Sequence, residues 1–289
     1  ERCPVMVCLR KLWMMLTLTL LALAEPPKLV LRWTGQGVQA EGQGWSQLYR
    51  ATRPLKPAEL NSELACYSQV GARDLELGEG VDYYYLARTT EGWMQAGPLS
   101  IPTRKLPTLQ HPRLLIDKQH YVLRVCDGFR VMKRYPVVMG RRARQRKLCY
   151  DNASTPEGRY RILGLQPSAT YYRAYDLDYP NRVDRARHRV LACREAIGGE
   201  IQIHGCGIGR NWTFGCIALR DSDMDELFAH TEIAAGVPCW IYGGELSLQD
   251  LQCDAEAGEY DPERLGRCQL ALGLQPTCLR DRRSKERGL

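Results

Sequence analysis

The sequence predicts a mainly β protein: an N-terminal antiparallel β-sandwich at residues 25–103, then a second β-rich domain at 112–243 that contains one short helix. Short segments rich in β-branched and aromatic residues alternate with turns rich in glycine and proline. The pattern changes near Pro112, and the segment before it holds prolines and cations, which is typical of a domain boundary. We assign 104–111 as the linker and expect an independent core on each side.

The composition excludes some classes of protein. Of 289 residues, 44% are hydrophobic and 25% charged, close to the average of globular proteins, so the chain is neither disordered nor fibrous. The net charge of +7 is modest for this length and does not point to nucleic-acid binding.

The first 24 residues have the features of a secretory signal peptide. Arg10 and Lys11 precede an apolar run from Leu12 to Ala24, which closes on Ala22-Leu23-Ala24. The run is short for a membrane span, which needs about 20 residues; an uncleaved anchor is the alternative. We therefore expect export, no stable membrane insertion after cleavage, and ten cysteines left in an oxidising compartment.

The N-terminal sandwich is predicted from three strand-like segments, at 29–33, 45–50 and 82–88. Four features resemble a fibronectin type III module: Trp33, Tyr49-Arg50, the tyrosines at 83–85, and the closing Gly97-Pro98-Leu99-Ser100. No group of acids, histidines or serines stands out there, so we expect a binding or spacing role.

The second domain is predicted as a series of strands with one helix near its end. We expect strands at 113–117, 121–125, 130–139, 158–163, 169–177, 200–203 and 233–242. Asp223 to His230 is expected to form the helix, with Ser222 as its N-cap. The basic run at 141–147 is expected to be a solvated loop, with attraction to an anionic surface as the alternative. Residues 244–289 are a polar, cysteine-containing extension.

Cys216 is the candidate nucleophile. It follows Gly215, which allows a tight turn whose backbone N–H groups can face an oxyanion. His204 lies twelve residues earlier, at the end of an apolar strand, and a neighbouring histidine activates a cysteine thiol. The spacing alone also fits a buried or disulfide-bonded cysteine. No histidine has partners at zinc spacing, so we expect no metal.

Several motifs then occur in order along the second domain. They are Asp151 to Tyr160 with its Thr-Pro-Glu-Gly segment, Tyr179-Pro180-Asn181, Ile203-His204-Gly205, Thr213 to Leu219 around Gly215-Cys216, Met224-Asp225-Glu226-Leu227, and Gly236-Val237-Pro238-Cys239-Trp240-Ile241. Together they resemble the L,D-transpeptidase catalytic domain, the YkuD-like family.

The resemblance implies an acyltransferase of the periplasm or cell envelope that acts on peptidoglycan stem peptides, with a role in cell-wall organisation and cell shape. The Cys216 thiolate would attack the carbonyl joining stem residues three and four, with His204 as the base. Backbone groups at Gly215 would hold the oxyanion, and Gly205 would orient His204. A wall polymer or a protein would accept the acyl group. No cofactor and no nucleic-acid partner are implied, and a carbapenem is expected to acylate Cys216.

Other residues near the motifs are candidates for substrate binding. Trp212, Thr213 and Arg220 flank the nucleophile; for Arg220 the alternative is a solvated cation. Tyr171 and Tyr172 are expected either to line a groove or to pack within a strand. Cys206 is expected to be half of a disulfide or a small buried residue, and Glu157 a structural residue.

The chain also departs from the family pattern. Phe214 stands where many members have His, Ala218 stands where many have Arg or Asn, and the interval from His204 to Cys216 is shorter. These differences keep the nucleophile and base but leave open an L,D-carboxypeptidase or amide hydrolase acting on wall-linked peptides. A non-catalytic wall-binding protein is the second alternative, which labelling of the thiol would distinguish.

Overall fold

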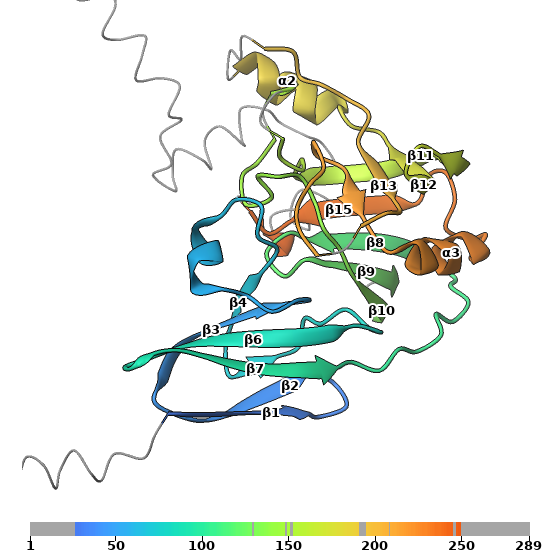
Figure 1. Ribbon diagram of the computed structural model, residues 1–289. Coiled ribbons are helices and arrows are strands. Elements are labelled where there is room, and N and C mark those ends of the chain that lie inside the picture. Colours follow the sequence, from blue (N-terminus) through green and yellow to red (C-terminus); the bar gives the residue numbers. More distant parts are fainter. Residues whose placement is uncertain are drawn as a thin grey trace, which may run out of the picture.

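The fold is mainly β, as the sequence predicts, and consists of a sandwich and a second, larger sheet (Figure 1). It is described by a computed structural model at residues 27–128, 130–147, 149–150, 153–190, 195–207, 209–244 and 247–249. The expected signal peptide, nearly all of the extension at 244–289, and Asp151 lie outside the described residues.

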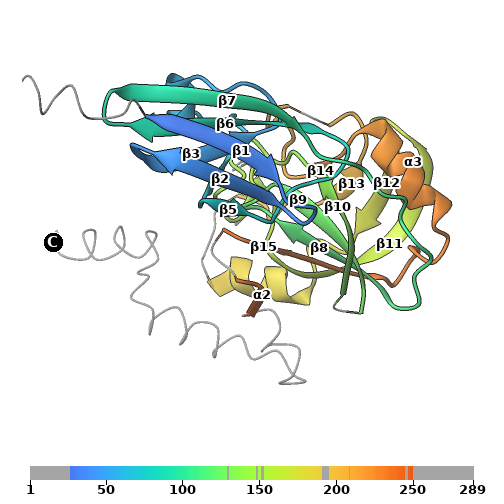
Figure 2. The same ribbon diagram turned by 90° about the horizontal axis from the view of Figure 1, so that it is seen from below.

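The N-terminal part is a sandwich of a three-stranded sheet, in the order β1-β2-β5, and a four-stranded sheet, in the order β4-β3-β6-β7. Its elements are β1 (Lys28–Trp33), β2 (Val38–Gln43), β3 (Trp45–Ala51), the 3-10 helix η1 (Pro57–Asn61), β4 (Ser68–Val70), β5 (Arg73–Asp74), β6 (Asp82–Thr89) and β7 (Gly92–Ser100). Figure 2 shows the strands of both sheets lying against one another. Val38, Leu48 and Tyr85 are buried in one cluster contributed by both sheets. The likeness to a fibronectin type III module stays a prediction.

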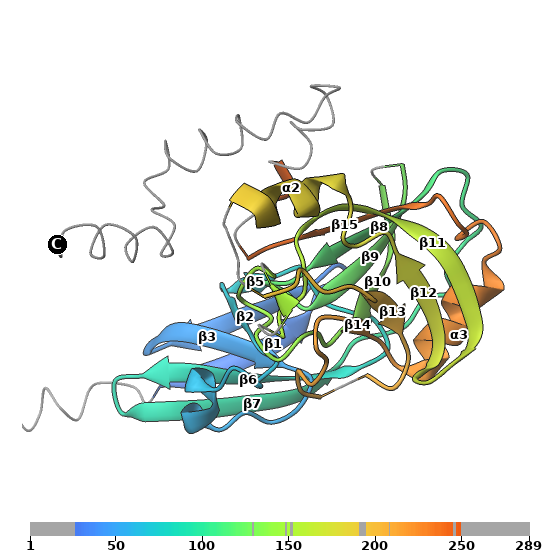
Figure 3. The ribbon, with the colours of Figure 1, turned by 90° about the horizontal axis from the view of Figure 1, so that it is seen from above.

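The second part is built on an eight-stranded sheet in the order β10-β9-β8-β15-β11-β12-β13-β14. Its strands are β8 (Pro112–Asp117), β9 (Val122–Asp127), β10 (Arg130–Pro136), β11 (Gly158–Ala169), β12 (Tyr172–Leu177), β13 (Gln202–His204), β14 (Ile217–Ala218) and β15 (Pro238–Tyr242). The long strand β11 pairs with β15 through residues 158–161 and with β12 through its later part. It therefore carries the sheet from one half of the domain to the other (Figure 3).

Helix α2 (Arg182–Val190) is absent from the sequence-based expectation. The Asn181 side chain accepts hydrogen bonds from the N–H groups of Val183 and Asp184, and the Asp184 carboxylate accepts one from the Asn181 N–H. This reciprocal pattern is a capping box. The Tyr160 hydroxyl of β11 also donates to Asp184, which fixes the start of α2 against the sheet.

Helix α3 (Asp221–Ala229) begins two residues earlier than predicted, with Arg220 and not Ser222 at its N-cap. The backbone N–H groups of Asp223 and Met224 both donate to the Arg220 carbonyl, so Ser222 lies within the first turn. The ring of Phe228 packs against Tyr175 of β12, with centroids 4.6 Å apart.

Several predicted strands have different bounds in the structure, and two predicted segments are interrupted by turns. β11 extends to Ala169, and Tyr172, with a φ of 73°, starts β12 after a tight turn, so 169–177 is not one strand. Within 233–242 only Pro238–Tyr242 is a strand. A turn precedes it, in which Gly236 has a φ of 91°, a conformation that suits glycine and interrupts a strand.

The two parts share buried charges and packed side chains. Arg50 of the sandwich is 2% exposed; it donates to Asp74 and to the carbonyl oxygen of His120 in the second part. The expected linker is packed as well, because Leu106 and Leu109 belong to the core of the second part. A flexible segment therefore does not separate the two cores. Within the described ranges, no helix combines the length and apolarity needed to cross a membrane.

The basic run at 141–147 is only partly solvated. Arg141 and Arg142 are exposed, and Arg142 pairs with Glu63 of the sandwich at 3.2 Å. Arg146 and Lys147 are buried, and Arg146 donates to the carbonyl oxygen of Glu157. The expectation of a solvated loop is wrong for these last two cations, which pack beneath the loop.

Candidate active site

Strands β13 and β14 bring Cys216 and His204 to neighbouring positions. The two strands are neighbours in the sheet (Figure 3). They are parallel, with Ile203 opposite Ile217 and His204 opposite Ala218. Cys216 directly precedes β14. Side chains two residues apart point to the same side of a strand, so Cys216 is expected on the same face as Ala218 and its partner His204, two register positions away.

His204 is almost fully buried and its ring is oriented by the backbone. It is 1% exposed, and its Nδ1 lies 2.7 Å from the carbonyl oxygen of Gly205. A carbonyl only accepts, so Nδ1 carries the proton and Nε2 is left with a free lone pair. Burial lowers the pKa of the imidazole, with the hydrogen bond to Gly205 acting in the opposite direction. The geometry favours a neutral ring that can accept a proton.

Cys216 is a partly exposed free thiol. Its Sγ lies 3.4 Å from the carbonyl oxygen of Glu200, a non-glycine residue with a φ of 54°. Burial raises the pKa of the thiol, while a backbone hydrogen bond from Gln202 and the charge of Lys147 act to lower it. A thiol with a raised pKa needs a neighbouring base to become a nucleophile.

The turn before Cys216 is held by Thr213. The Thr213 hydroxyl donates to the carbonyl oxygen of Cys216 at 2.7 Å and accepts a bond from the N–H of Gly215 at 3.2 Å. Thr213 is 3% exposed, so it shapes the nucleophile turn and does not face substrate as expected. The N–H of Gly215, expected to face an oxyanion, is engaged with this hydroxyl.

The backbone conformation and the close packing at position 215 both require glycine. Its φ is 139°, and a Cβ there would lie 2.9 Å from the carbonyl oxygen of Ser154. The segment at 154–157 thus backs the nucleophile turn. It is fixed from the other side by Lys118, whose ammonium donates to the carbonyl of Thr155 and pairs with Glu157 at 2.7 Å. The buried pair gives Glu157 the structural role that the sequence predicts.

Aromatic rings form one side of the site. The ring of Tyr171 lies 5.1 Å from that of His204 and 5.2 Å from that of Trp212. Trp212 is 5.7 Å from His204. Tyr171 is exposed at 44% and lies in the turn between β11 and β12, so it is not packed within a strand.

Arg220 has a role that the sequence does not predict. Its guanidinium donates to Asp223 at 2.7 Å and to the carbonyl oxygens of Gly80 and Glu79 in the sandwich. Because these acceptors occupy the guanidinium, Arg220 is not available for the substrate binding that the sequence predicts. Cys206 is an exposed free thiol whose N–H donates to Asp221, so neither expectation for this residue is met.

Gly205 holds the loop after the base. Its N–H donates to the carbonyls of Tyr171 and Arg173, and a Cβ at this position would lie 2.5 Å from the Asp221 carboxylate.

Sequence reasoning missed Lys147, because a run of cations usually indicates a solvated loop. No group of metal-binding side chains is found within the described part of the chain.

The comparisons with known proteins agree with the motifs. Residues 111–241 match the model of the YkuD family, the L,D-transpeptidase catalytic domain. No curated protein matches the chain significantly.

Three solved structures are similar to the chain. An L,D-transpeptidase from Xylanimonas cellulosilytica is 17% identical over 49% of this chain and 64% of its own, with a TM-score of 0.32. One from Stackebrandtia nassauensis is 18% identical over 47% and 57%, with a TM-score of 0.31. L,D-transpeptidase 1 from Mycobacterium tuberculosis is 10% identical over 68% and 94%, with a TM-score of 0.31. The chain spans less than two thirds of the first two structures.

Proposed function

We propose, from the match of residues 111–241 to the L,D-transpeptidase catalytic domain, that this protein is an exported transpeptidase of peptidoglycan stem peptides with Cys216 as its nucleophile. That match is the observation that carries the proposal, because the matched range includes both His204 and Cys216. The placement of these two residues on one face of neighbouring strands supports it.

The proposed reaction begins with transfer of the Cys216 thiol proton to Nε2 of His204. The thiolate attacks the stem carbonyl, and the tetrahedral intermediate collapses to a thioester as the terminal D-amino acid leaves with the proton from His204. An amine of a second stem then attacks the thioester and forms the cross-link, and the thiol is regenerated. The carbonyl of Gly205 supports the histidinium, since it accepts the bond from Nδ1.

Backbone N–H groups of the nucleophile turn are proposed to face the oxyanion. The N–H of Gly215 donates over 3.2 Å to Thr213, a long bond that substrate can compete for. Trp212 and Tyr171 are the residues we propose to contact the stem peptide, because their rings adjoin His204.

Hydrolysis is a second candidate. Ala218 is fully buried and pairs with Val138 through the backbone, so it offers the incoming acceptor no polar side chain. Water as the acceptor would shorten the stem without forming a cross-link, the outcome of an L,D-carboxypeptidase.

Export is supported by the cysteine chemistry. Cys149 is disulfide-bonded, and disulfides persist in oxidising compartments. We propose that the protein acts in the periplasm or cell envelope.

Mass spectrometry of products from purified muropeptides with tetrapeptide stems tests the function. The transpeptidase predicts cross-linked dimers that have lost one terminal D-amino acid, and the hydrolase predicts tripeptide stems alone. Cys216→Ala is the matched control and should give neither product. Unchanged muropeptides with the folded wild-type protein would contradict both candidates.

A further inference from the structure

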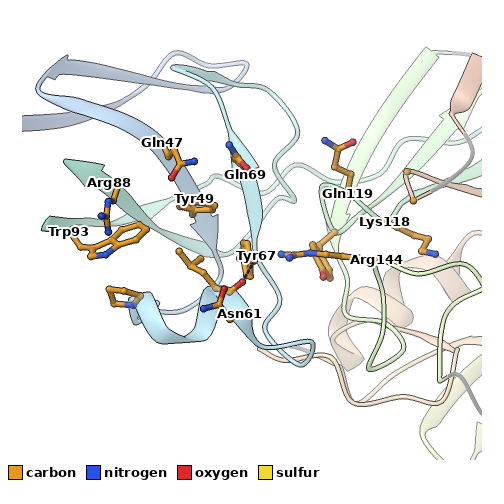
Figure 4. Close-up of a pocket in the computed structure, with 15 residues that line it drawn as sticks. Gln47, Tyr49, Asn61, Tyr67, Gln69, Arg88, Trp93, Lys118, Gln119 and Arg144 are labelled. Carbon is orange, nitrogen blue, oxygen red and sulfur yellow. Dashed lines mark hydrogen bonds between the residues drawn. The ribbon is translucent and has the colours of Figure 1, made fainter. Parts of the chain in front are cut away.

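A cavity lies where the sandwich meets the larger domain. It has a volume of about 830 Å³, within the range of ligand sites, about 300–1,000 Å³. The sandwich contributes side chains from β3, β4, β6, β7 and η1, and the second domain contributes Lys118, Gln119 and Arg144 from the opposite side (Figure 4). None of the residues proposed for the transpeptidase reaction lines it.

Aromatic rings form the sandwich side of the cavity. Tyr49 packs edge-on against Tyr67 with centroids 5.7 Å apart. Its ring is tilted against that of Trp93, with centroids 6.0 Å apart. Tyr49 and Trp93 are half-buried, so parts of their rings face the cavity (Figure 4). The hydroxyl of Tyr67 donates to the carbonyl of Leu60, which fixes its ring. Rigid, half-exposed rings offer apolar faces on which the C–H side of a sugar ring stacks.

Amide side chains stand around these rings. Gln47, Gln69, Asn61 and Gln119 are exposed and line the cavity. Among the residues described, their side-chain amides have no hydrogen-bond partner, so their donors and acceptors are available. An amide both donates and accepts, which suits the hydroxyl and acetamido groups of a saccharide.

The charge of the cavity has one sign. Arg88 lies over the ring of Trp93 at 4.9 Å, and Arg144 over the ring of Tyr67 at 4.0 Å. Within the described ranges no lining residue is acidic and neither arginine forms an ion pair. The third cation, Lys118, is neutralised by Glu157. The cavity therefore suits a neutral or anionic ligand and disfavours a cationic one.

We propose that this cavity is an oligosaccharide-binding site, which accepts a hydroxyl-rich glycan that is neutral or carries carboxylates. Aromatic stacking faces, free amides and stacked guanidinium groups together match this chemistry. The site goes beyond the proposed transpeptidase function, since binding here needs neither Cys216 nor a stem peptide.

Calorimetric titration of the full-length protein tests the proposal with two probes. One is the hexamer of N-acetylglucosamine, which is neutral; the other is wall glycan freed of its stem peptides, whose lactyl groups carry carboxylates. If both probes bind, the site recognises the sugar groups that they share. If only the wall glycan binds, Arg88 and Arg144 recognise its carboxylates. Binding of neither probe overturns the proposal.

Variants place the binding in the cavity. Trp93→Ala should raise the Kd about tenfold or more, as expected for loss of a buried aromatic contact. Arg88→Ala and Gln69→Ala alter exposed side chains and decide the question if Trp93→Ala unfolds. Arg73→Ala is the matched control, an exposed arginine of the sandwich outside the cavity, and should leave the Kd unchanged.

Glycan binding in the cavity can be tested independently of catalysis at Cys216. Cys216→Ala should bind both probes like the wild type. An unchanged Kd in Arg88→Ala and Gln69→Ala, or displacement of the sugar by a free stem peptide, would overturn the proposal without affecting the transpeptidase assignment.

Discussion

Nδ1 of His204 donates a hydrogen bond of 2.7 Å to the carbonyl oxygen of Gly205, the next residue in the chain. The bond fixes the tautomer and the plane of a ring that is almost fully buried. It links the base to the backbone of the loop that Asp221 and Tyr172 surround. In the proposed mechanism, this carbonyl orients the histidine as a carboxylate does in many catalytic triads.

Replacement of His204 tests its role as the base. His204→Gln should keep the fold and lower kcat by about 10²–10⁴-fold, the contribution typical of a positioned proton-transfer group. The single-turnover rate of thioester formation with a tetrapeptide stem measures it. A wild-type rate in a folded variant would assign the base elsewhere.

The pH profile tests the same residue without mutation. The base works as the neutral ring, and burial lowers its pKa, so His204 stays neutral below the ordinary value of about 6.5. We expect the acid limb of kcat/KM to have its midpoint below pH 6.5. Since the pKa of Cys216 is raised, the protonated thiol persists at neutral pH and the rate should not fall there. A midpoint above 6.5 would contradict this assignment.

Cys216 should be the residue that a carbapenem modifies. The intact mass of the wild-type protein should increase by one adduct, whereas Cys216→Ala and Cys216→Ser should show none, because a hydroxyl is far less ionised than a thiol. The control is Cys206→Ser, which removes an exposed free thiol two residues after His204. An adduct that persists in Cys216→Ala and disappears in Cys206→Ser would reverse the assignment.

A pair of glycines separates backbone strain from close contact. Gly209 has a φ of 100° with open space around it, whereas Gly215 has a φ of 139° and the Ser154 carbonyl close by. Gly209→Ala and Gly215→Ala should each lose about 1–3 kcal/mol of unfolding free energy in urea from the strained φ. Only Gly215→Ala should also slow acylation, by about tenfold or more, because it displaces the nucleophile turn. Equal acylation rates would show that Ser154 does not define the turn.

Removal of the sandwich should destabilise the second domain. A chain that starts at Pro107 loses Cys66, a member of the large core cluster, and the carbonyls that accept bonds from Arg220. We expect a lower midpoint of thermal unfolding and a lower acylation rate than in the full chain. An unchanged midpoint would mean that the two cores are independent after all.

Strand positions were predictable where the side-chain pattern alone decides them, as in β1, β3, β6 and β8. Helix α2 was missed because its nine residues, Arg182–Val190, are mostly charged, and Val183, Ala186 and Val190 form only a narrow apolar stripe. A local signal was present, since Asn181 and Asp184 have the spacing of a capping box. The bounds of α3 depended on Arg220, whose carbonyl begins the helix, and no pattern rule selects an arginine as N-cap.

At the candidate site, Cys216 and His204 stood out through the order of several motifs, which spacing alone could not supply. The roles of Thr213 and Arg220 could not be read from the sequence, because each is set by partners distant from a substrate: the nucleophile turn for Thr213 and the sandwich for Arg220. The aromatic cavity combines residues from β3 to β7 with Arg144, and only the packing of the two parts brings them together.

The buried Arg50 limits which sandwich can be joined to the second part of this protein. Its buried guanidinium binds Asp74 and Ser68 within the sandwich and the carbonyl of His120 beyond it. A foreign sandwich grafted onto residue 112 would lack that charge and leave the carbonyl without its donor, at a cost of about 1–3 kcal/mol. The two parts are therefore expected to be inherited together as one unit, and exchange of one part between relatives would require matching changes in the other.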